Sequence, residues 1–282
     1  MNAPTLVLPP VDALPRTVVL DLDGTAFDPS GVLSQRSQHA IAWLLDREVP
    51  VVIATARPLR VVRTRIDRDL LGRLSVIHMN GIGLAHRGVP HVSTAPRLAV
   101  EAAEHIVALV AALAPHARLV CEIEGETFGC DSFADAETLW AVNSATPDMV
   151  IPVAEALASG IVKIAVNGFD QSLSVLAATI DEELGAAVTV IREASGAFLN
   201  IVPPGTSKEA ALLRLFPDAP PWPGMWAFGD DLGDLELLRL AEYGVAMANA
   251  HPSVLEAARY RTYSNADDGV AHVLERLIEA HG

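Results

Sequence analysis

The sequence predicts an α/β protein: a doubly wound, Rossmann-like parallel sheet with a second, α+β domain inserted into it. Short apolar runs alternate with helical patterns near both ends of the chain, and each run stops at a polar turn. The middle of the chain instead shows hairpin patterns mixed with helices. Short apolar runs are typical of strands buried on both faces, and their alternation with helices indicates a parallel sheet. The length of 282 residues agrees with two domains.

The first part of the core follows this strand–helix rhythm. Ser34 is a suitable N-cap for a helix whose apolar residues recur at helical spacing. Pro58 suits the first turn of the next helix, because its fixed backbone angle is already helical. Apolar runs predict the strands, at residues 17–20 (TVVL), 51–54 (VVIA) and 75–79 (SVIHM).

The pattern changes after the third strand and returns near Thr206. In between we expect helices at 99–113, 135–141 and 172–184, and strands at 119–122, 127–129, 161–166, 188–190 and 197–202. After Thr206 a helix precedes strands at 226–228, 245–247 and 260–263, each followed by a helix. The predicted domains are an N-terminal arm at 1–16, a core at 17–81 and 204–282, and a cap at 82–203.

Composition excludes several classes of partner. The formal charge is −15, with 35 acidic and 20 basic residues, which argues against nucleic acid or an anionic membrane surface. No apolar run approaches the roughly 20 residues that cross a bilayer, and the N-terminus lacks a signal-peptide pattern. We therefore expect a cytoplasmic protein with no obligate protein partner, whose Cys121 and Cys130 are reduced thiols.

Polar residues collect at the predicted carboxyl ends of the strands. Parallel strands end at one edge of the sheet, and open α/β sheets bind their ligands there. Several carboxylates at that edge would repel one another without a cation. Oxygen ligands without Cys or His favour a hard ion, and Mg²⁺ beside carboxylates and phosphate is the common case. The residues placed at this edge are Asp21, Asp23, Thr55, Arg57, Asn80, Asp230, Asp231, Asp234 and Asn249.

Four motifs follow one another in a specific order: DxDGT at residues 21–25, Thr55, Lys208, and GDxxxD at 229–234. Together they resemble the motifs of the haloacid dehalogenase superfamily. Further phrases resemble its Cof-type, or class IIB, sugar-phosphatase-like branch: residues 80–81 (NG), 203–208, 244–250 (GVAMANA) and 268–271 (DGVA). An inserted cap of the C2B type is the architecture of that branch, and the resemblance extends from about Thr17 onward.

The resemblance implies a Mg²⁺-dependent phosphatase acting on a small phosphorylated metabolite, with sugar phosphates as the first guess. Asp21 would attack phosphorus and form an aspartyl phosphate, and Asp23 would act as the general acid and base. It assigns the metal to Asp21, Asp23 (through its backbone carbonyl), Asp230 and Asp234. It assigns the bound phosphate to Thr55, Lys208, Asn249 and Gly24.

The chain departs from the family pattern at three positions. Gly233 stands where the fourth motif usually has Asn, Ala56 where the second often has Gly, and Ala248 where the loop before Asn249 usually has Gly. We still expect activity, with altered positioning of the metal. Two alternatives remain: a phosphomutase using the same aspartyl phosphate, and a non-catalytic Mg²⁺-binding regulatory protein on this fold.

Overall fold

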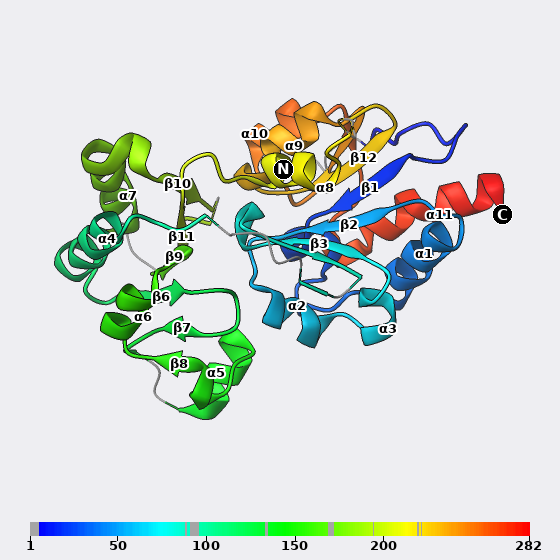
Figure 1. Cartoon of the computed structure of the whole chain (residues 1–282). Helices are drawn as coiled ribbons and strands as arrows, with labels where there is room; N and C mark the ends of the chain where they lie inside the picture. Colours follow the sequence, from blue (N-terminus) through cyan, green and yellow to red (C-terminus); the bar gives the residue numbers. More distant parts are fainter. Residues whose placement is uncertain are drawn as a thin grey trace. The chain divides into compact units, whose positions relative to one another are not determined.

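The computed structural model describes residues 6–87, 89–90, 96–132, 135–168, 172–193, 195–218, 220 and 222–282 (Figure 1). The chain forms two compact units. The first comprises Met1–Ala56, Arg65–His91 and Lys208–Gly282, and the second comprises Arg57–Thr64 and Val92–Ser207. The chain therefore leaves the first unit directly after Ala56, and again after His91, before it returns at Lys208.

The sheet of the first unit has the strand order β14-β13-β12-β1-β2-β3-β4-β5. From β14 to β3 neighbouring strands are parallel, whereas β4 and β5 are antiparallel to their neighbours. The chain runs from β1 to β2 on one side and returns through β12 on the other, so β1 lies at the point where strand order reverses (Figure 1). The strands are β1 (Thr17–Leu20), β2 (Val51–Ala54), β3 (Ser75–His78), β4 (Gly83–His86), β5 (Val89–Pro90), β12 (Met225–Gly229), β13 (Tyr243–Ala246) and β14 (Tyr260–Arg261).

The prediction of a doubly wound parallel core is therefore confirmed. Its central strands are buried on both faces, as the continuous apolar runs indicated: Val19 and Val52 on one face, and Leu20 and Phe228 on the other, have no solvent-exposed surface. Burying a side chain of this size contributes about 2 kcal/mol. The sequence did not indicate β4 and β5, which extend the sheet as an antiparallel edge.

Helices cover the sheet of the first unit: α1 (Gln35–Asp46), α3 (Arg68–Leu71), α8 (Lys208–Leu215), α9 (Leu235–Leu240), α10 (Pro252–Ala257) and α11 (Gly269–His281). The hydroxyl of Ser34 caps α1 as expected, accepting the backbone N–H of Ser37 at 3.1 Å. On α11, the buried residues Val270, Val273, Leu274 and Leu277 form one apolar stripe. The helices α1 and α11 pack side by side (Figure 1).

The described part of the N-terminal arm lies against the first unit. Val7 forms a two-way backbone bridge with Arg261 of β14. The guanidinium of Arg276 donates to the carbonyl of Pro9 at 2.9 Å, and a ring nitrogen of His281 lies 2.8 Å from the carbonyl of Val11. The arm thus pairs with the edge strand and with the end of α11.

The second unit has a sheet of strand order β10-β11-β9-β6-β7-β8, antiparallel except for β7 and β8. Its strands are β6 (Arg118–Glu122), β7 (Phe128–Gly129), β8 (Val150–Ile151), β9 (Lys163–Asn167), β10 (Thr189–Arg192) and β11 (Phe198–Val202). The helices α4 (Val100–Leu113), α5 (Ala136–Asn143), α6 (Val153–Ser159) and α7 (Ser172–Leu184) accompany it, and its main core includes Ile106, Ile164, Leu176 and Ile201.

A buried ion pair attaches helix α2 (Leu59–Arg65) to the second unit. The guanidinium of Arg60 donates to both carboxylate oxygens of Glu122, at 2.6 and 2.7 Å, and both residues are only 4% exposed. It also lies 4.4 Å above the ring of Phe128. These contacts explain why residues 57–64 belong to the second unit, although the sequence rhythm placed them in the core.

None of the helices in the described part of the chain has the length and apolar character needed to span a membrane.

Candidate active site

The residues singled out at the strand ends meet within the first unit. Asp21 directly follows β1, and Asp230 directly follows the neighbouring strand β12. The backbone N–H of Asp21 donates to the carbonyl of Phe228 at 3.1 Å, which continues the pairing of these two strands by one residue. Both carboxylates therefore lie at the edge where a doubly wound sheet binds its ligands.

Asp21 begins a tight turn, the segment 21–27, which we call the nucleophile turn. Its backbone closes through two bonds: the N–H of Ala26 donates to the carbonyl of Asp21 at 3.2 Å, and that of Phe27 to Leu22 at 2.8 Å. Gly24 has a φ of +79°, and a Cβ built there would lie 2.1 Å from a carboxylate oxygen of Asp230. Only glycine fits both this conformation and this close approach.

Lys208, the first residue of α8, bridges two of the carboxylates. Its ammonium donates to Oδ1 of Asp21 and to Oδ1 of Asp234, each at 2.6 Å. The three residues are 6%, 6% and 1% exposed, so these contacts are shielded from water. Charge-assisted bonds of this kind are short and strong, and here they hold Asp21 in one orientation.

Asp234 also organises the loop that carries Asp230. Its Oδ2 accepts the backbone N–H groups of Asp230 at 3.1 Å and of Asp231 at 3.2 Å. Asp230 is held separately, because the hydroxyl of Thr25 in the nucleophile turn donates to its Oδ1 at 2.7 Å. A Cβ at Gly229 would lie 2.5 Å from that of Asp234, so this loop also needs a glycine.

Burial and mutual repulsion raise the pKa values of these acids. Burial raises the pKa of Asp21 well above its usual range, against the opposing charge of Lys208, while Asp234 and Asp230 raise it further. The pKa of Asp230 is raised to about 7, first by burial and then by Asp234. Burial alone would lower the pKa of Lys208, but Asp21 and Asp234 outweigh it and raise the pKa, so Lys208 stays charged.

These carboxylates fit a divalent cation. Asp21, Asp230 and Asp234 each offer one oxygen, and these atoms lie within 4.8 Å of one another. With the single ammonium of Lys208 beside three acids, the cluster carries excess negative charge when all are ionised. A hard cation would remove that repulsion, and carboxylates are the ligands that Mg²⁺ takes in proteins. Because Lys208 and two amides already occupy Asp234, Asp21 and Asp230 are the better direct ligands.

Asp23, Thr55 and Asn249 also follow strands of the first unit at this edge, whereas Arg57, which the sequence placed there, belongs to the second unit. The side chain of Asp23 is exposed within the nucleophile turn, and Thr55 is fully buried after β2. Two backbone hydrogen bonds hold Thr55. Its N–H donates to the carbonyl of Ile77 at 2.9 Å, and its carbonyl accepts the N–H of Asn80 at 3.1 Å. Its place is therefore set by β3 and the turn that follows it.

Asn249 uses both polar atoms of its side chain on the protein. Its Nδ2 donates to the carbonyl of Gly24 at 2.7 Å, and its Oδ1 accepts the backbone N–H of Asn265 at 2.9 Å. Asn265 was not among the predicted site residues. Its position in the polar turn after β14 was the signal that could have found it, because that turn ends at the same edge of the sheet.

Comparison with known proteins decides the family. The sequence model of the haloacid dehalogenase-like hydrolases matches residues 18–274. This chain belongs to the haloacid dehalogenase-like hydrolase family. The resemblance carried by the four motifs is therefore confirmed.

Two curated relatives from Bacillus subtilis, both named as phosphatases, match this chain over nearly their whole length. The 5-amino-6-(5-phospho-D-ribitylamino)uracil phosphatase YitU is 24% identical over 276 residues, covering 95% of this chain and 99% of the relative. The phosphatase YwtE, named for the same substrate, is 25% identical over 289 residues, covering 93% of this chain and 98% of the relative. The family and these relatives confirm the prediction of a phosphoric monoester hydrolase.

Solved structures share the fold at lower identity. SMU.1108c from Streptococcus mutans matches with a TM-score of 0.79 and 22% identity, covering 95% of this chain and 100% of that one. The subclass IIB sugar phosphatase BT4131 matches with a TM-score of 0.70 and 18% identity, covering 93% of this chain and 98% of that one. At the level of fold, this haloacid dehalogenase-like hydrolase therefore resembles the predicted branch.

Proposed function

We propose that this hydrolase is a Mg²⁺-dependent phosphatase that transfers phosphate from a small phosphorylated metabolite to Asp21 and then to water. The observation that carries the proposal is the buried bridge from Lys208 to Asp21, with Asp230 beside it at the edge of the sheet. It joins an oriented carboxylate nucleophile, a fixed positive charge and a set of oxygen ligands for a cation.

The first half of the reaction forms a covalent intermediate on the protein. Lys208 binds Oδ1 of Asp21, so the other carboxylate oxygen is the one that attacks phosphorus. As the new bond forms, the ester P–O bond breaks, and the carboxyl group of Asp23 gives its proton to the leaving oxygen. Its exposed position in the nucleophile turn suits exchange of that proton with solvent.

The second half returns the enzyme to its starting state. Asp23, now a carboxylate, takes a proton from water, and the resulting hydroxide attacks phosphorus and breaks the bond to Asp21. Thr55 and Lys208 would contact the phosphoryl oxygens during both halves. Mg²⁺ held by Asp21, Asp230 and the carbonyl of Asp23 would supply the positive charge that draws the phosphoryl group towards the nucleophile. Asp234 would keep Lys208 and the Asp230 loop in place.

We further propose that the second unit acts as the cap that selects the substrate. All of it lies between Thr55 and Lys208, the second and third motifs, while the first unit holds the whole carboxylate cluster. Closure of a cap excludes water and so strengthens electrostatic contacts with a phosphoryl group. The curated relatives make a phosphorylated sugar alcohol attached to a heterocycle a candidate substrate beside simple sugar phosphates.

The test is a panel of phosphate monoesters that includes hexose phosphates, pentose phosphates and 5-amino-6-(5-phospho-D-ribitylamino)uracil. Inorganic phosphate release is measured with Mg²⁺ and with excess chelator. We expect release from at least one monoester that is lost in chelator and restored by Mg²⁺. Release that is indifferent to chelator, or isomerisation of a sugar phosphate that requires a bisphosphate activator, would contradict the proposal.

A further inference from the structure

We propose that Asn265 is a positioning residue that, together with Asn249, holds the nucleophile turn in its working orientation. The two side chains belong to different loops, Asn249 after β13 and Asn265 after β14. The side chain of Asn249 donates to the backbone carbonyl of Gly24 at 2.7 Å, and the side chain of Asn265 donates to the backbone carbonyl of Phe27 at 2.9 Å. The backbone N–H of Asn265 also donates to Oδ1 of Asn249 at 2.9 Å, which joins the two into one clasp.

The nucleophile turn needs these donors because it is too short to satisfy its own carbonyl groups. Its two internal bonds use the carbonyls of Asp21 and Leu22. A single turn leaves its last carbonyls without partners inside the helix. The clasp supplies amide donors to two of the later ones, at Gly24 and Phe27. Both ends of the segment that contains Thr25 are therefore fixed from outside.

Fixing this segment fixes the chemistry on either side of it. Asp21 and Asp23 precede the carbonyl of Gly24, and the hydroxyl of Thr25 holds Asp230 at 2.7 Å. A rotation of the turn would move the nucleophile, the proton donor and the Thr25–Asp230 contact together. Groups behind the direct ligands of a site commonly set its metal affinity and its geometry.

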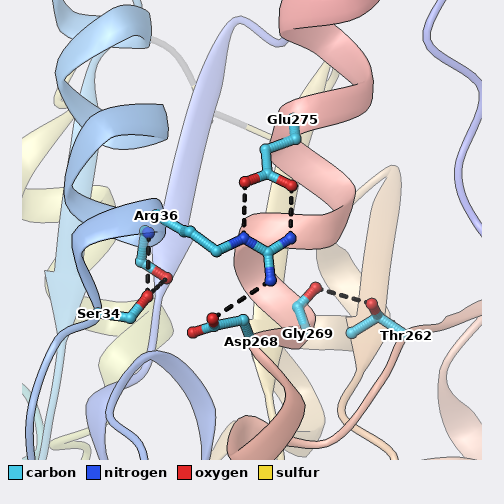
Figure 2. Close-up of polar contacts among 7 residues, drawn as sticks. Ser34, Arg36, Thr262, Asp268, Gly269 and Glu275 are labelled. Carbon is cyan, nitrogen blue, oxygen red and sulfur yellow. Dashed lines mark hydrogen bonds and ion pairs between the residues drawn. The ribbon is translucent and has the colours of Figure 1, made fainter.

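The loop that carries Asn265 is itself anchored by hydrogen bonds, one of which, from Thr262 to Gly269, is drawn in Figure 2. The hydroxyl of Thr262 donates to the carbonyl of Gly269 at 2.7 Å, and the N–H of Gly269 donates to Ser264 at 3.0 Å, which closes the loop around Asn265. A Cβ at Gly269 would lie 2.2 Å from the carbonyl of Tyr263, so the loop tolerates no larger residue there.

Arg36 then ties this loop to helix α1. Its guanidinium forms a fork with Glu275 at 2.9 and 2.6 Å, and donates to Asp268 at 3.3 Å (Figure 2). Because Asp268 and Glu275 lie at the start and in the body of α11, the fork holds α11 against α1. Asn265 therefore reaches the nucleophile turn from a loop closed on itself and backed by two packed helices.

The experiment uses the full chain and compares Asn265→Ala, Asn249→Ala and the double variant. Asp267→Asn is the matched control: it lies two residues from Asn265, contacts Ser264 and keeps an acceptor for that hydroxyl. The first measurement is hydrogen exchange of the backbone amides of Ala26 and Phe27 without metal. Loss of one clasp bond should speed their exchange about fivefold, and more in the double variant. The control and the peptides of α4 should keep the wild-type rate.

The second measurement is the affinity for Mg²⁺, determined by calorimetric titration with Mg²⁺ alone. We expect Asn265→Ala to bind Mg²⁺ about tenfold more weakly. In turnover of an aryl phosphate, kcat should fall while KM changes less than about threefold. Unchanged exchange at Ala26 and Phe27 in the double variant would overturn the clasp. So would a rise in KM confined to Asn249→Ala, which would make Asn249 a phosphate ligand.

This inference rests on the proposed function for its consequences in turnover, but exchange and Mg²⁺ binding test it separately. If the wild-type protein releases no phosphate and Asn265→Ala still speeds exchange in the turn, the clasp stands and the proposed function fails. If the wild type is active and exchange is unchanged, the clasp fails alone.

Discussion

The substitution Asp230→Asn should stabilise the protein in the absence of metal. Burial, and then the charge of Asp234, raise the pKa of Asp230 from 3.8 to about 7 in the folded state. A raised carboxyl pKa means that ionisation opposes folding, so stability falls as pH rises from about 4 to about 7 and is then constant. A shift of about 3 units at about 1.4 kcal/mol each gives a cost of about 4 kcal/mol at pH 8. Asparagine carries no charge and keeps Oδ1 as an acceptor for Thr25.

The assay is urea denaturation in chelator at pH 5 and pH 8. Tryptophan fluorescence reports mainly on the first unit, which contains Trp43, Trp222 and Trp226, whereas Trp140 lies in the second. We expect Asp230→Asn to raise the free energy of unfolding at pH 8 by up to about 4 kcal/mol, and by much less at pH 5.

Magnesium should reverse the order of stability. Mg²⁺ should stabilise the wild type, because a ligand that binds only the folded state adds free energy of unfolding, and it should stabilise Asp230→Asn far less. Asp231→Asn is the comparison for loss of a neighbouring charge: its side chain caps the adjacent single-turn helix, at 2.8 Å from the N–H of Leu232. Its charge raises the pKa of Asp230 less than burial and Asp234 do, so Asp231→Asn should stabilise the metal-free protein less than Asp230→Asn and leave Mg²⁺ stabilisation in place. Equal or lower stability of Asp230→Asn at pH 8 in chelator would refute the account of a crowded carboxylate cluster that needs a cation.

Three other substitutions test separate parts of the account. Asp23→Asn should slow turnover of sugar phosphates more than that of an activated aryl phosphate, because only the poorer leaving group needs a proton; equal losses would count against it. Lys208→Met should abolish activity and cost about 3–5 kcal/mol in metal-free protein, since it leaves two buried carboxylates without their cation; full stability in urea would be unexpected. Glu122→Gln should cost a similar amount in the second unit, because Arg60 loses its buried partner; hydrogen exchange should rise in β6 and β9, and a rise in β1 instead would disagree.

Much of the core could be predicted because its signals are local. Each central strand is an apolar run, and each polar turn follows its strand directly in the sequence. The rule that parallel strands end at one edge then placed Asp21, Asp230 and Asp234 together. Lys208 follows no core strand and was predicted from the motif resemblance alone, and it contacts Asp21 from 187 residues away. Their catalytic roles stay predictions until turnover is measured.

The rest depends on contacts that leave no periodic pattern. Arg60 and Glu122 are 62 residues apart, and nothing near either one indicates a buried pair. Their contact moves residues 57–64 into the second unit. The strand β8 has only two residues, too few for any alternation to show. The clasp of Asn249 and Asn265 consists of amide bonds to backbone carbonyls, which any loop asparagine could make in principle.

The most direct test of the central claim is turnover by Asp21→Asn on the best substrate of the wild type, with Mg²⁺ saturating. Asparagine keeps the size of the side chain but cannot form the aspartyl phosphate, so we predict a loss of at least about a thousandfold with the fold intact by circular dichroism. If Asp21→Asn keeps more than about a tenth of the wild-type rate, phosphate does not pass through Asp21 and the mechanism proposed here is wrong.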